Sequence, residues 1–260
     1  MKTNLSILSI VFAGLFAMNS YAALHTETIE YKQGDTTCEG YLAYDDAVKG
    51  PRPGVLVVHD WLGLDSYPKM RADMLAKLGY VAFAADIYGK GVRPKGTAEA
   101  MAQTKIYKGD RPLLRARVNA ALDVLEKQPQ VDTKRVAAIG YCFGGTTVLE
   151  LARSGADIAG IVTFHGGLDT PTRDAKNIQC KVLLCHGADD PYVPAADVTA
   201  LQDELRSAKV DWQMIYYSGA VHSFTRPDSG NDNSKGAAYN EHADKRSWEA
   251  MKEFFAEIFR

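Results

Sequence analysis

A cysteine, an aspartate and a histidine follow one another along this chain at positions that suit nucleophilic catalysis. The cysteine, Cys142, stands in the segment 140–145, GYCFGG, directly after the apolar run Val136 to Ile139. Glycines two before and two after a nucleophile are typical of a sharp turn between a strand and a helix, because a side chain at either position would collide with neighbouring backbone. The segment therefore predicts a strained turn that exposes the Cys142 thiol.

Residues Thr146 to Arg153 are expected to form a helix after this turn. The N-terminus of that helix would direct backbone N–H groups and the positive end of its dipole at the sulfur, which favours the thiolate. The pattern is short, and a buried, unreactive cysteine would also fit it. The interpretation of Cys142 as a nucleophile therefore depends on a base and an acid elsewhere in the chain.

For the base, His222 is the leading candidate among six histidines. It lies in a loop that begins at Ser218, between the last expected strand and the last expected helix, and from there an imidazole can reach the turn. We expect His25 and His242 to be solvated surface residues. The other three end strands and are expected to be packed in the core or beside the site: His59, His165 and His186.

An acid that orients the histidine is expected in the turn-rich loop 187–194, GADDPYVP. We choose Asp190 because Pro191 and Pro194 make the chain directly after it rigid, and Asp189 is the alternative. The nucleophile, the acid and the base would then follow one another in the chain order of α/β-hydrolases.

These residues need a fold that brings the ends of several strands together. Six runs are too continuously apolar for a sheet with one exposed face: Gly54–His59, Val81–Ala85, Val136–Ile139, Gly160–Phe164, Val182–Cys185 and Gln213–Tyr217. Helical stretches lie between or after them: Tyr67–Leu78, Leu113–Glu126, Thr146–Arg153, Ala196–Ala208 and Ser247–Phe259. This alternation predicts an α/β fold with a doubly wound, mostly parallel sheet, in which ligands meet the carboxyl ends of the strands. Thr26–Tyr31 and Cys38–Tyr44 are predicted to add an N-terminal antiparallel hairpin.

The composition is that of a globular domain with a small-molecule partner. The chain has 260 residues, of which 46% are hydrophobic and 24% charged, and a formal net charge of -2. The absence of a basic block argues against nucleic acid as a partner. We expect a single domain over residues 23–260, acting as a monomer and without a metal or an organic cofactor.

The first 22 residues differ in kind from the rest. Lys2 precedes an almost wholly apolar run, Leu5 to Met18, and small residues occupy the two positions that a signal peptidase reads, Ser20 and Ala22. Residues 1–22 therefore predict a cleavable signal peptide, and with it a periplasmic or secreted protein. A membrane anchor is the alternative, but the run is shorter than the roughly 20 residues needed to span a bilayer. No stable membrane insertion is expected after cleavage.

Export would place the cysteines where disulfides can form. If Cys142 stays free, one disulfide could form between two of the other three cysteines, Cys38, Cys180 and Cys185. The sequence does not indicate which two would pair.

In three segments the chain resembles the dienelactone hydrolase (carboxymethylenebutenolidase) family of the α/β-hydrolase superfamily. These are GYCFGG at 140–145, G-x-x-D-x-x-V-P at 187–194 and H-S-F-x-R at 222–226, and the similarity extends over essentially the whole mature chain. The resemblance implies an α/β-hydrolase fold and a Cys142, His222, Asp190 triad that opens a lactone or another activated ester through a thioester. The backbone N–H groups of Phe143 and Trp61 would form the oxyanion hole.

At two positions the chain departs from the family pattern. Asp60 stands where the family carries a glutamate that keeps the resting thiol neutral until substrate binds. The family grips a substrate carboxylate with two arginines, for which this chain offers Arg226 and Lys90. A lysine is a point charge without the planar fork of arginine, so preference for a carboxylated dienelactone is expected to be weaker. The alternatives are a turn-forming Asp60 and a solvated loop Lys90.

Two other functions fit the same residues. One is a general carboxylesterase or thioesterase. The other is a non-catalytic exported thiol or binding protein, in which Cys142 is oxidised or paired with a second cysteine. The segment Lys95 to Pro112 would serve either as a cover for the substrate or as a plain connection.

Overall fold

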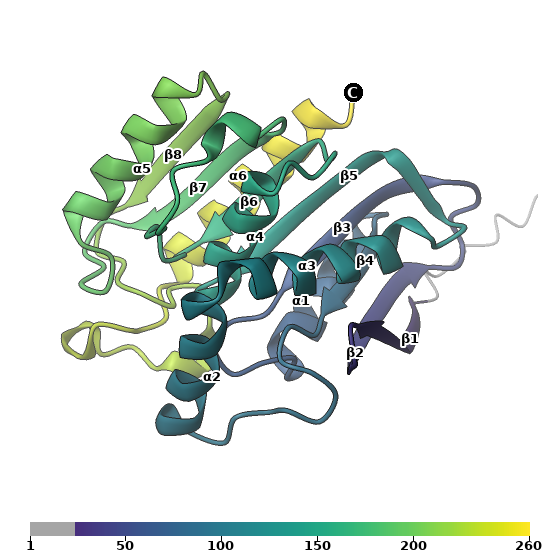
Figure 1. Cartoon of the computed structure of the whole chain (residues 1–260), viewed down its shortest axis with the longest axis horizontal. Helices are drawn as coiled ribbons and strands as arrows, with labels where there is room; N and C mark the ends of the chain where they lie inside the picture. Colours follow the sequence, from purple (N-terminus) through teal and green to yellow (C-terminus); the bar gives the residue numbers. More distant parts are fainter. Residues whose placement is uncertain (1–23) are drawn as a thin grey trace, which may run out of the picture.

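The computed structural model describes residues 24–260, so the predicted signal peptide lies outside the described residues. Eight strands form one sheet in the order β1-β2-β4-β3-β5-β6-β7-β8 (Figure 1). Their bounds are β1 Leu24–Gln33, β2 Thr36–Asp45, β3 Arg52–Val58, β4 Val81–Ala85, β5 Val131–Tyr141, β6 Gly160–Phe164, β7 Lys181–Gly187 and β8 Trp212–Tyr217. Strands β3 to β8 run parallel, whereas β1 pairs antiparallel with β2, and β2 antiparallel with β4.

Helices cover both faces of this sheet. Their bounds are α1 Ser66–Lys77, α2 Thr97–Gly109, α3 Arg111–Glu126, α4 Phe143–Arg153, α5 Ala195–Ser207 and α6 Glu241–Ile258, with short 3₁₀ turns at Ala175–Asn177, Pro227–Ser229 and Asn233–Lys235. None of the helices within residues 24–260 is long and apolar enough to cross a bilayer.

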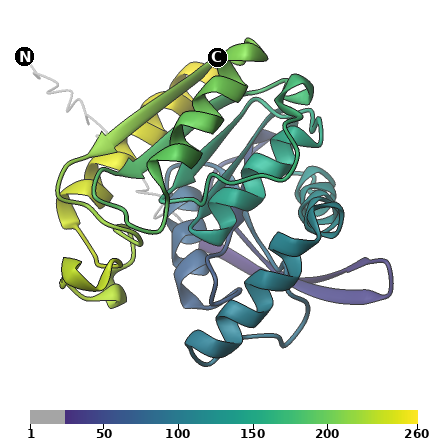
Figure 2. The same ribbon diagram turned by 60° about the vertical axis from the view of Figure 1, so that its left-hand side comes forward.

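The alternation of side chains along the central strand β3 divides the core in two. Leu56 and Val58 belong to the apolar cluster that includes residues of α3, α4 and α5. Val55 and Val57 belong to the cluster that includes residues of α1 and α6. Successive side chains of a strand point to opposite faces, so a fully apolar run is what a strand covered on both faces requires. The predicted α/β fold with a mostly parallel sheet and an N-terminal hairpin is therefore confirmed, and Figure 2 shows the hairpin (purple) extending past the helices.

Two elements begin well before the residues that their sequence patterns predicted. Strand β5 begins at Val131, which pairs with Arg52 of β3 before a shift in register, and so the polar residues ahead of the apolar run are also in the sheet. Helix α6 begins at Glu241 because the side chain of Asn240 accepts a hydrogen bond from the N–H of Ala243 and caps the helix.

The segment from Lys95 to Pro112 is mostly helical. It contains α2 and the start of α3, whose first turn is capped by Asp110, which accepts a hydrogen bond from the N–H of Leu113. The hydroxyl of Tyr107 on α2 donates to the carbonyl of Tyr88 at 3.1 Å. This contact attaches α2 to the carboxyl end of the sheet, where the candidate residues lie.

The turn between β5 and α4 is packed too closely for side chains at its glycines. A Cβ on Gly140 would lie 2.0 Å from the carbonyl oxygen of Gly144, and a Cβ on Gly144 would lie 2.3 Å from the carbonyl oxygen of Val58. A Cβ on Gly145 would lie 2.6 Å from the Cα of Gly166. The neighbours are all backbone atoms, which cannot rotate away, so the spacing of the glycines follows from the close approach of β5, α4 and β3.

We expect Gly140→Ala to destabilise the protein strongly, because the new methyl group would force β5 and α4 apart. Overpacking of this kind costs about 3 kcal/mol, which lowers the melting temperature of a chain of this size by roughly 6–12 °C. Thermal unfolding followed by circular dichroism measures it. Gly109→Ala is the matched control, because no heavy atom lies within 4 Å of its Cβ position. A Gly140→Ala protein that melts with the control would contradict this account.

Candidate active site

Cys142 occupies the strained position of the turn. Its backbone has φ 53 and ψ -112, a region that residues with a Cβ rarely adopt, and its N–H donates a 3.0 Å hydrogen bond to the carbonyl of Phe164 on β6. The turn lifts the side chain off the sheet, so the half-buried sulfur borders a pocket. Helix α4 starts at the next residue, Phe143, and its amino end therefore faces the sulfur.

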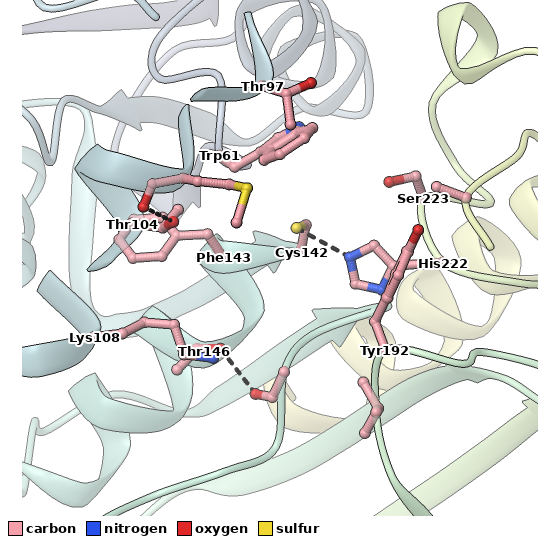
Figure 3. Close-up of a pocket in the computed structure, with 14 residues that line it drawn as sticks. Trp61, Thr97, Thr104, Lys108, Cys142, Phe143, Thr146, Tyr192, His222 and Ser223 are labelled. Carbon is pink, nitrogen blue, oxygen red and sulfur yellow. Dashed lines mark hydrogen bonds between the residues drawn. The ribbon is translucent and has the colours of Figure 1, made fainter. Parts of the chain in front are cut away.

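The structure brings Cys142, His222 and Asp190 into one hydrogen-bonded row. The Nε2 atom of His222 lies 3.0 Å from the Sγ atom of Cys142, and its Nδ1 atom lies 2.8 Å from Oδ2 of Asp190. Figure 3 shows the imidazole facing the sulfur from the far side of the pocket. With both ring nitrogens engaged, the histidine can hold a proton between the thiol and the carboxylate.

The loop that carries His222 is fixed by its backbone. The N–H of His222 donates to the carbonyl of Gly236 at 3.1 Å, and the N–H of Ala238 donates to the carbonyl of His222 at 3.0 Å. At the other end of the loop, a Cβ on Gly187 would lie 2.6 Å from the carbonyl oxygen of Ala220. The loop therefore lies directly on the end of β7, and this holds the imidazole near the sulfur.

The two neighbouring aspartates have different partners. Asp190 is buried, and its Oδ1 atom accepts a 2.9 Å hydrogen bond from the N–H of Tyr192 while Oδ2 faces His222. Asp189 is exposed and accepts a hydrogen bond from the N–H of Gly219 at 3.0 Å. Asp190 is thus the carboxylate that contacts the histidine, and Asp189 supports the histidine loop.

The electrostatics of the row favour a charged imidazole. Burial by itself would lower the pKa of His222, but the thiolate of Cys142 and the carboxylate of Asp190 outweigh burial and raise that pKa to about 10. The ring is therefore held as an imidazolium whenever the sulfur beside it is ionised. The edge of the Tyr192 ring system lies beside it, with the two ring centroids 5.5 Å apart.

The two residues whose backbone N–H groups were predicted to form the oxyanion hole, Phe143 and Trp61, both border the pocket. Phe143 is the first residue of α4, so its N–H has no acceptor within the helix. Trp61 borders the same pocket in the loop after β3. That loop is held by the Asp60 carboxylate, which accepts from the N–H of Leu62 at 2.8 Å, and by the Tyr88 hydroxyl, which donates to the carbonyl of Trp61 at 3.1 Å.

A pocket of about 420 Å³ opens over the sulfur. Its lining combines aromatic and aliphatic side chains with several hydroxyl groups and one lysine: Trp61, Thr97, Met101, Thr104, Lys108, Cys142, Phe143, Thr146, Gly167, Tyr192, Val193, His222, Ser223 and Ala237. The volume is at the small end of the range for ligand pockets, which suits a compact substrate.

Helix α2 supplies one wall of this pocket, and the sequence analysis did not assign it. Thr97, Met101, Thr104 and Lys108 border the pocket. They are spaced i, i+4, i+7 and i+11, which places them on one face of a helix. That spacing was the available signal, and the structure shows that the segment covers the site and is not a plain connection.

Arg226 and Asp60 form an ion cluster beside the pocket and do not border it. The guanidinium donates to Asp60 at 2.6 Å, to Asp65 at 2.7 Å and to Asp228 at 2.8 Å. Among the described residues, the Asp60 side chain bonds to Arg226 and Leu62 and makes no hydrogen bond to Cys142.

Lys90 is not brought to the site. Its side chain is exposed and forms an ion pair with Glu30 on β1, and it does not border the pocket. The side chain extends toward the N-terminal hairpin, because β1 and β2 lie at that edge of the sheet. No contact of Lys90 in this structure therefore supports its predicted role in substrate binding.

The buried histidines are packed as expected. His59 receives a hydrogen bond from the N–H of Ile87 at Nε2, and its Nδ1 lies 2.6 Å from the carbonyl of Asp60, so burial lowers its pKa and it stays neutral. His165 lies 2.7 Å from the hydroxyl of Thr225, and burial together with His222 holds its pKa well below the usual range. Neither borders the pocket.

The sequence matches a known family over most of its length. The family model for the dienelactone hydrolase family matches residues 38–259, a span that runs from within β2 to the end of α6. The described Cys142, Asp190 and His222 all fall within this span.

Individual relatives agree with that match. A Bradyrhizobium protein described as a probable 2-oxo-3-(5-oxofuran-2-ylidene)propanoate lactonase is 30% identical over 214 residues, which are 76% of this chain and 86% of the relative. A dienelactone hydrolase-like promiscuous phosphotriesterase from metagenomic libraries is 47% identical, with a TM-score of 0.88, over 92% of this chain and 100% of that one. A dienelactone hydrolase from Anabaena variabilis is 18% identical, with a TM-score of 0.67, over 91% of this chain and 99% of that one, a likeness of fold alone.

We expect Cys142→Ala to lower the pKa of His222 by roughly one unit or more. The variant loses the anion that opposes the effect of burial, so only Asp190 remains to raise the pKa. NMR titration of the imidazole resonances measures it. Cys180→Ala removes a distant buried thiol and should leave the His222 pKa near 10. An unchanged pKa in Cys142→Ala would show that the sulfur carries no charge beside the ring.

Proposed function

Because this chain belongs to the dienelactone hydrolase family and is a hydrolase of carboxylic ester or lactone bonds, we propose that Cys142 is its nucleophile and that the reaction passes through a thioester. The observation that carries the proposal is the hydrogen-bonded row, with 3.0 Å between the Cys142 sulfur and His222 and 2.8 Å between His222 and Asp190. A thiolate next to an imidazolium is a strong nucleophile beside a ready proton donor.

In the first half of the reaction, the Cys142 thiolate attacks the carbonyl carbon of the ester. The carbonyl π electrons move to the oxygen, and this oxyanion accepts hydrogen bonds from the N–H groups of Phe143 and Trp61. The tetrahedral adduct collapses, the C–O bond breaks, and the His222 Nε2–H gives its proton to the departing alkoxide. For a lactone, that hydroxyl stays attached to the acyl group. The product of this half is an acyl thioester on Cys142 and a neutral imidazole.

In the second half, the neutral His222 removes a proton from water, which attacks the thioester carbon. The C–S bond breaks, a carboxylic acid leaves, and the thiolate and imidazolium are restored. Asp190 orients the ring and stabilises the positive charge through both halves, as a buried carboxylate on Nδ1 does in hydrolytic triads.

Phosphotriesters are a second substrate class that we propose for the same nucleophile. The supporting observation is the 47% identity, over 92% of this chain, to a protein described as a promiscuous phosphotriesterase. The thiolate would attack phosphorus and displace an aryloxide, and water would then release the diester from sulfur. The chemistry needs the same anion-stabilising N–H groups and no additional residue.

The structure gives little support to the alternative of a non-catalytic thiol protein. None of the four cysteines, all within residues 24–260, forms a disulfide, and Cys38, Cys180 and Cys185 are buried. Burial raises the pKa of the thiol of each of these three, which makes them poor partners for exchange. A sulfur that faces an imidazole and an open pocket fits catalysis better.

We expect Cys142→Ala to reduce turnover of 4-nitrophenyl butyrate by roughly ten thousandfold or more while the protein stays folded. Asp190→Asn should cost roughly a hundredfold or more, because the tautomer of the ring is no longer fixed. Asp189→Asn is the matched control, since its carboxylate contacts Gly219 and not the histidine. Initial rates and circular dichroism measure both effects.

Mass spectrometry of His222→Ala after mixing with the ester should show the acyl mass on Cys142. The phosphotriester is tested with the same variants.

Turnover that survives in folded Cys142→Ala would refute the cysteine mechanism. Turnover of the ester without the phosphotriester would refute only the second substrate class.

We also propose that the protein is exported to the periplasm or secreted. The support is the residue pattern of the first 22 residues, with Lys2, the apolar run and Ala22. The protein recovered from the producing cells should begin at Ala23, as measured by N-terminal mass spectrometry after osmotic release. Material that still begins at Met1 and remains in the cell pellet would contradict export.

A further inference from the structure

The guanidinium of Arg226 uses four of its five N–H donors in hydrogen bonds to carboxylates of the protein. Nε and Nη2 donate to Asp228 at 2.8 and 3.0 Å, Nη2 also donates to Asp65 at 2.7 Å, and Nη1 donates to Asp60 at 2.6 Å. The side chain is buried and its planar face lies over the ring of Tyr67, 5.0 Å from the centroid. To hold a substrate carboxylate with two hydrogen bonds, the arginine would have to break at least one of these contacts.

The cluster around Arg226 carries excess negative charge. One guanidinium faces three carboxylates, Asp60, Asp65 and Asp228, so with these ionised the sum is -2. The cluster is close in sequence to two residues that border the pocket, Trp61 and Ser223. Asp60 directly precedes Trp61, and Arg226 lies three residues after Ser223. An anion bound on this side of the nucleophile would meet a field that repels it.

The remaining cations near the pocket are also balanced. Lys108 is the one lysine or arginine among the described residues that border the pocket, and it pairs with Asp169 at 2.8 Å. In Figure 3 it approaches from the side of Thr146, away from Trp61 and His222. The imidazolium of His222 lies between the Cys142 sulfur and Asp190. No described cation is therefore free beside the scissile bond.

The walls around the sulfur are mainly apolar. Trp61, Met101, Phe143 and Val193 border the pocket together with the hydroxyl groups of threonines. Such a lining offers no charge that would offset the desolvation of a carboxylate, and burying a carboxylate without a partner costs free energy. The same lining favours the binding of an alkyl or aryl group, by roughly 25 cal/mol of binding free energy per Å² of apolar surface removed from water.

We propose that this site selects neutral esters and lactones with an apolar acyl group and discriminates against substrates that carry a carboxylate close to the scissile bond. The inference rests on the proposed function, because it concerns what the Cys142 nucleophile meets. It assigns Arg226 to the structure of the pocket wall and makes Asp65 and Asp228 specificity-determining residues, which hold the arginine and supply the repelling charge.

The test compares two esters that differ by one group. 4-Nitrophenyl butyrate and mono-4-nitrophenyl succinate have the same leaving group and acyl chain length, with a methyl group in one replaced by a carboxylate in the other. After subtraction of the enzyme-free rates, we expect kcat/KM to be about tenfold or more higher for the butyrate. The ratio should shrink as ionic strength rises from about 0.02 M to about 0.5 M, because salt screens the repulsion.

Asp228→Asn tests the origin of the discrimination. Asp228 is exposed and lies outside the pocket, so the variant should change kcat/KM for the butyrate less than it changes kcat/KM for the succinate monoester. Its kcat/KM for the succinate monoester should rise about threefold, because the cluster loses one negative charge. Asp203→Asn is the matched control, since this exposed aspartate on α5 pairs with Arg206 and its loss changes net charge equally.

The outcomes separate this inference from the proposed function. Loss of butyrate turnover in Cys142→Ala tests the nucleophile alone. If that loss is seen and the wild-type protein nevertheless prefers the succinate monoester, the neutral substrate class is overturned while the cysteine mechanism stands. If Lys108→Met then removes this preference for the succinate monoester, Lys108 binds the substrate carboxylate, and the neutral substrate class is again overturned. An equal response of Asp228→Asn and Asp203→Asn would overturn the role of the cluster.

Discussion

The close approach of Gly140 to Gly144 is the constraint on which the rest of the site depends. It lets helix α4 start one residue after the nucleophile position, and it forces Cys142 into a backbone conformation that a side chain normally avoids. The strain is maintained because β5 and α4 are packed against fully buried neighbours on both sides. A looser turn would let the sulfur sink toward the sheet, away from the amino end of the helix and from the histidine.

Two groups of charged residues lie at or beside the pocket. The first is the row of sulfur, imidazole and carboxylate, in which Cys142 and Asp190 raise the pKa of the buried His222 imidazole to about 10. The second is Arg226 with its three carboxylates, which braces the loop after β3 and the loop after His222. The same ion pairs occupy four of the five N–H donors of Arg226, so the arginine cannot hold a ligand carboxylate with two hydrogen bonds unless one of these contacts breaks. Structural bracing and substrate choice are thus coupled in one set of contacts.

The wall made by α2 completes the site from the opposite direction. Tyr107 ties this helix to Tyr88, and Tyr88 in turn holds the carbonyl of Trp61. The position of the Trp61 N–H, one of the two proposed oxyanion donors, therefore depends on a helix that lies outside the sheet. Tyr88 therefore connects α2 to the loop that carries Trp61.

Local patterns in the sequence predicted the fold and most of the residues that lie together in the candidate site. The apolar runs predicted the parallel strands, and the glycines around Cys142 predicted the turn, because strand burial and steric clash act between near neighbours. His222 was chosen as the base because it follows the last expected strand, where the chain order of α/β-hydrolases places the histidine. Only the tertiary structure separated Asp190 from Asp189, turned Lys90 toward Glu30 and surrounded Arg226 with carboxylates. Those outcomes depend on contacts between residues as far as 166 positions apart, as with Asp60 and Arg226, and no local pattern encodes such pairings.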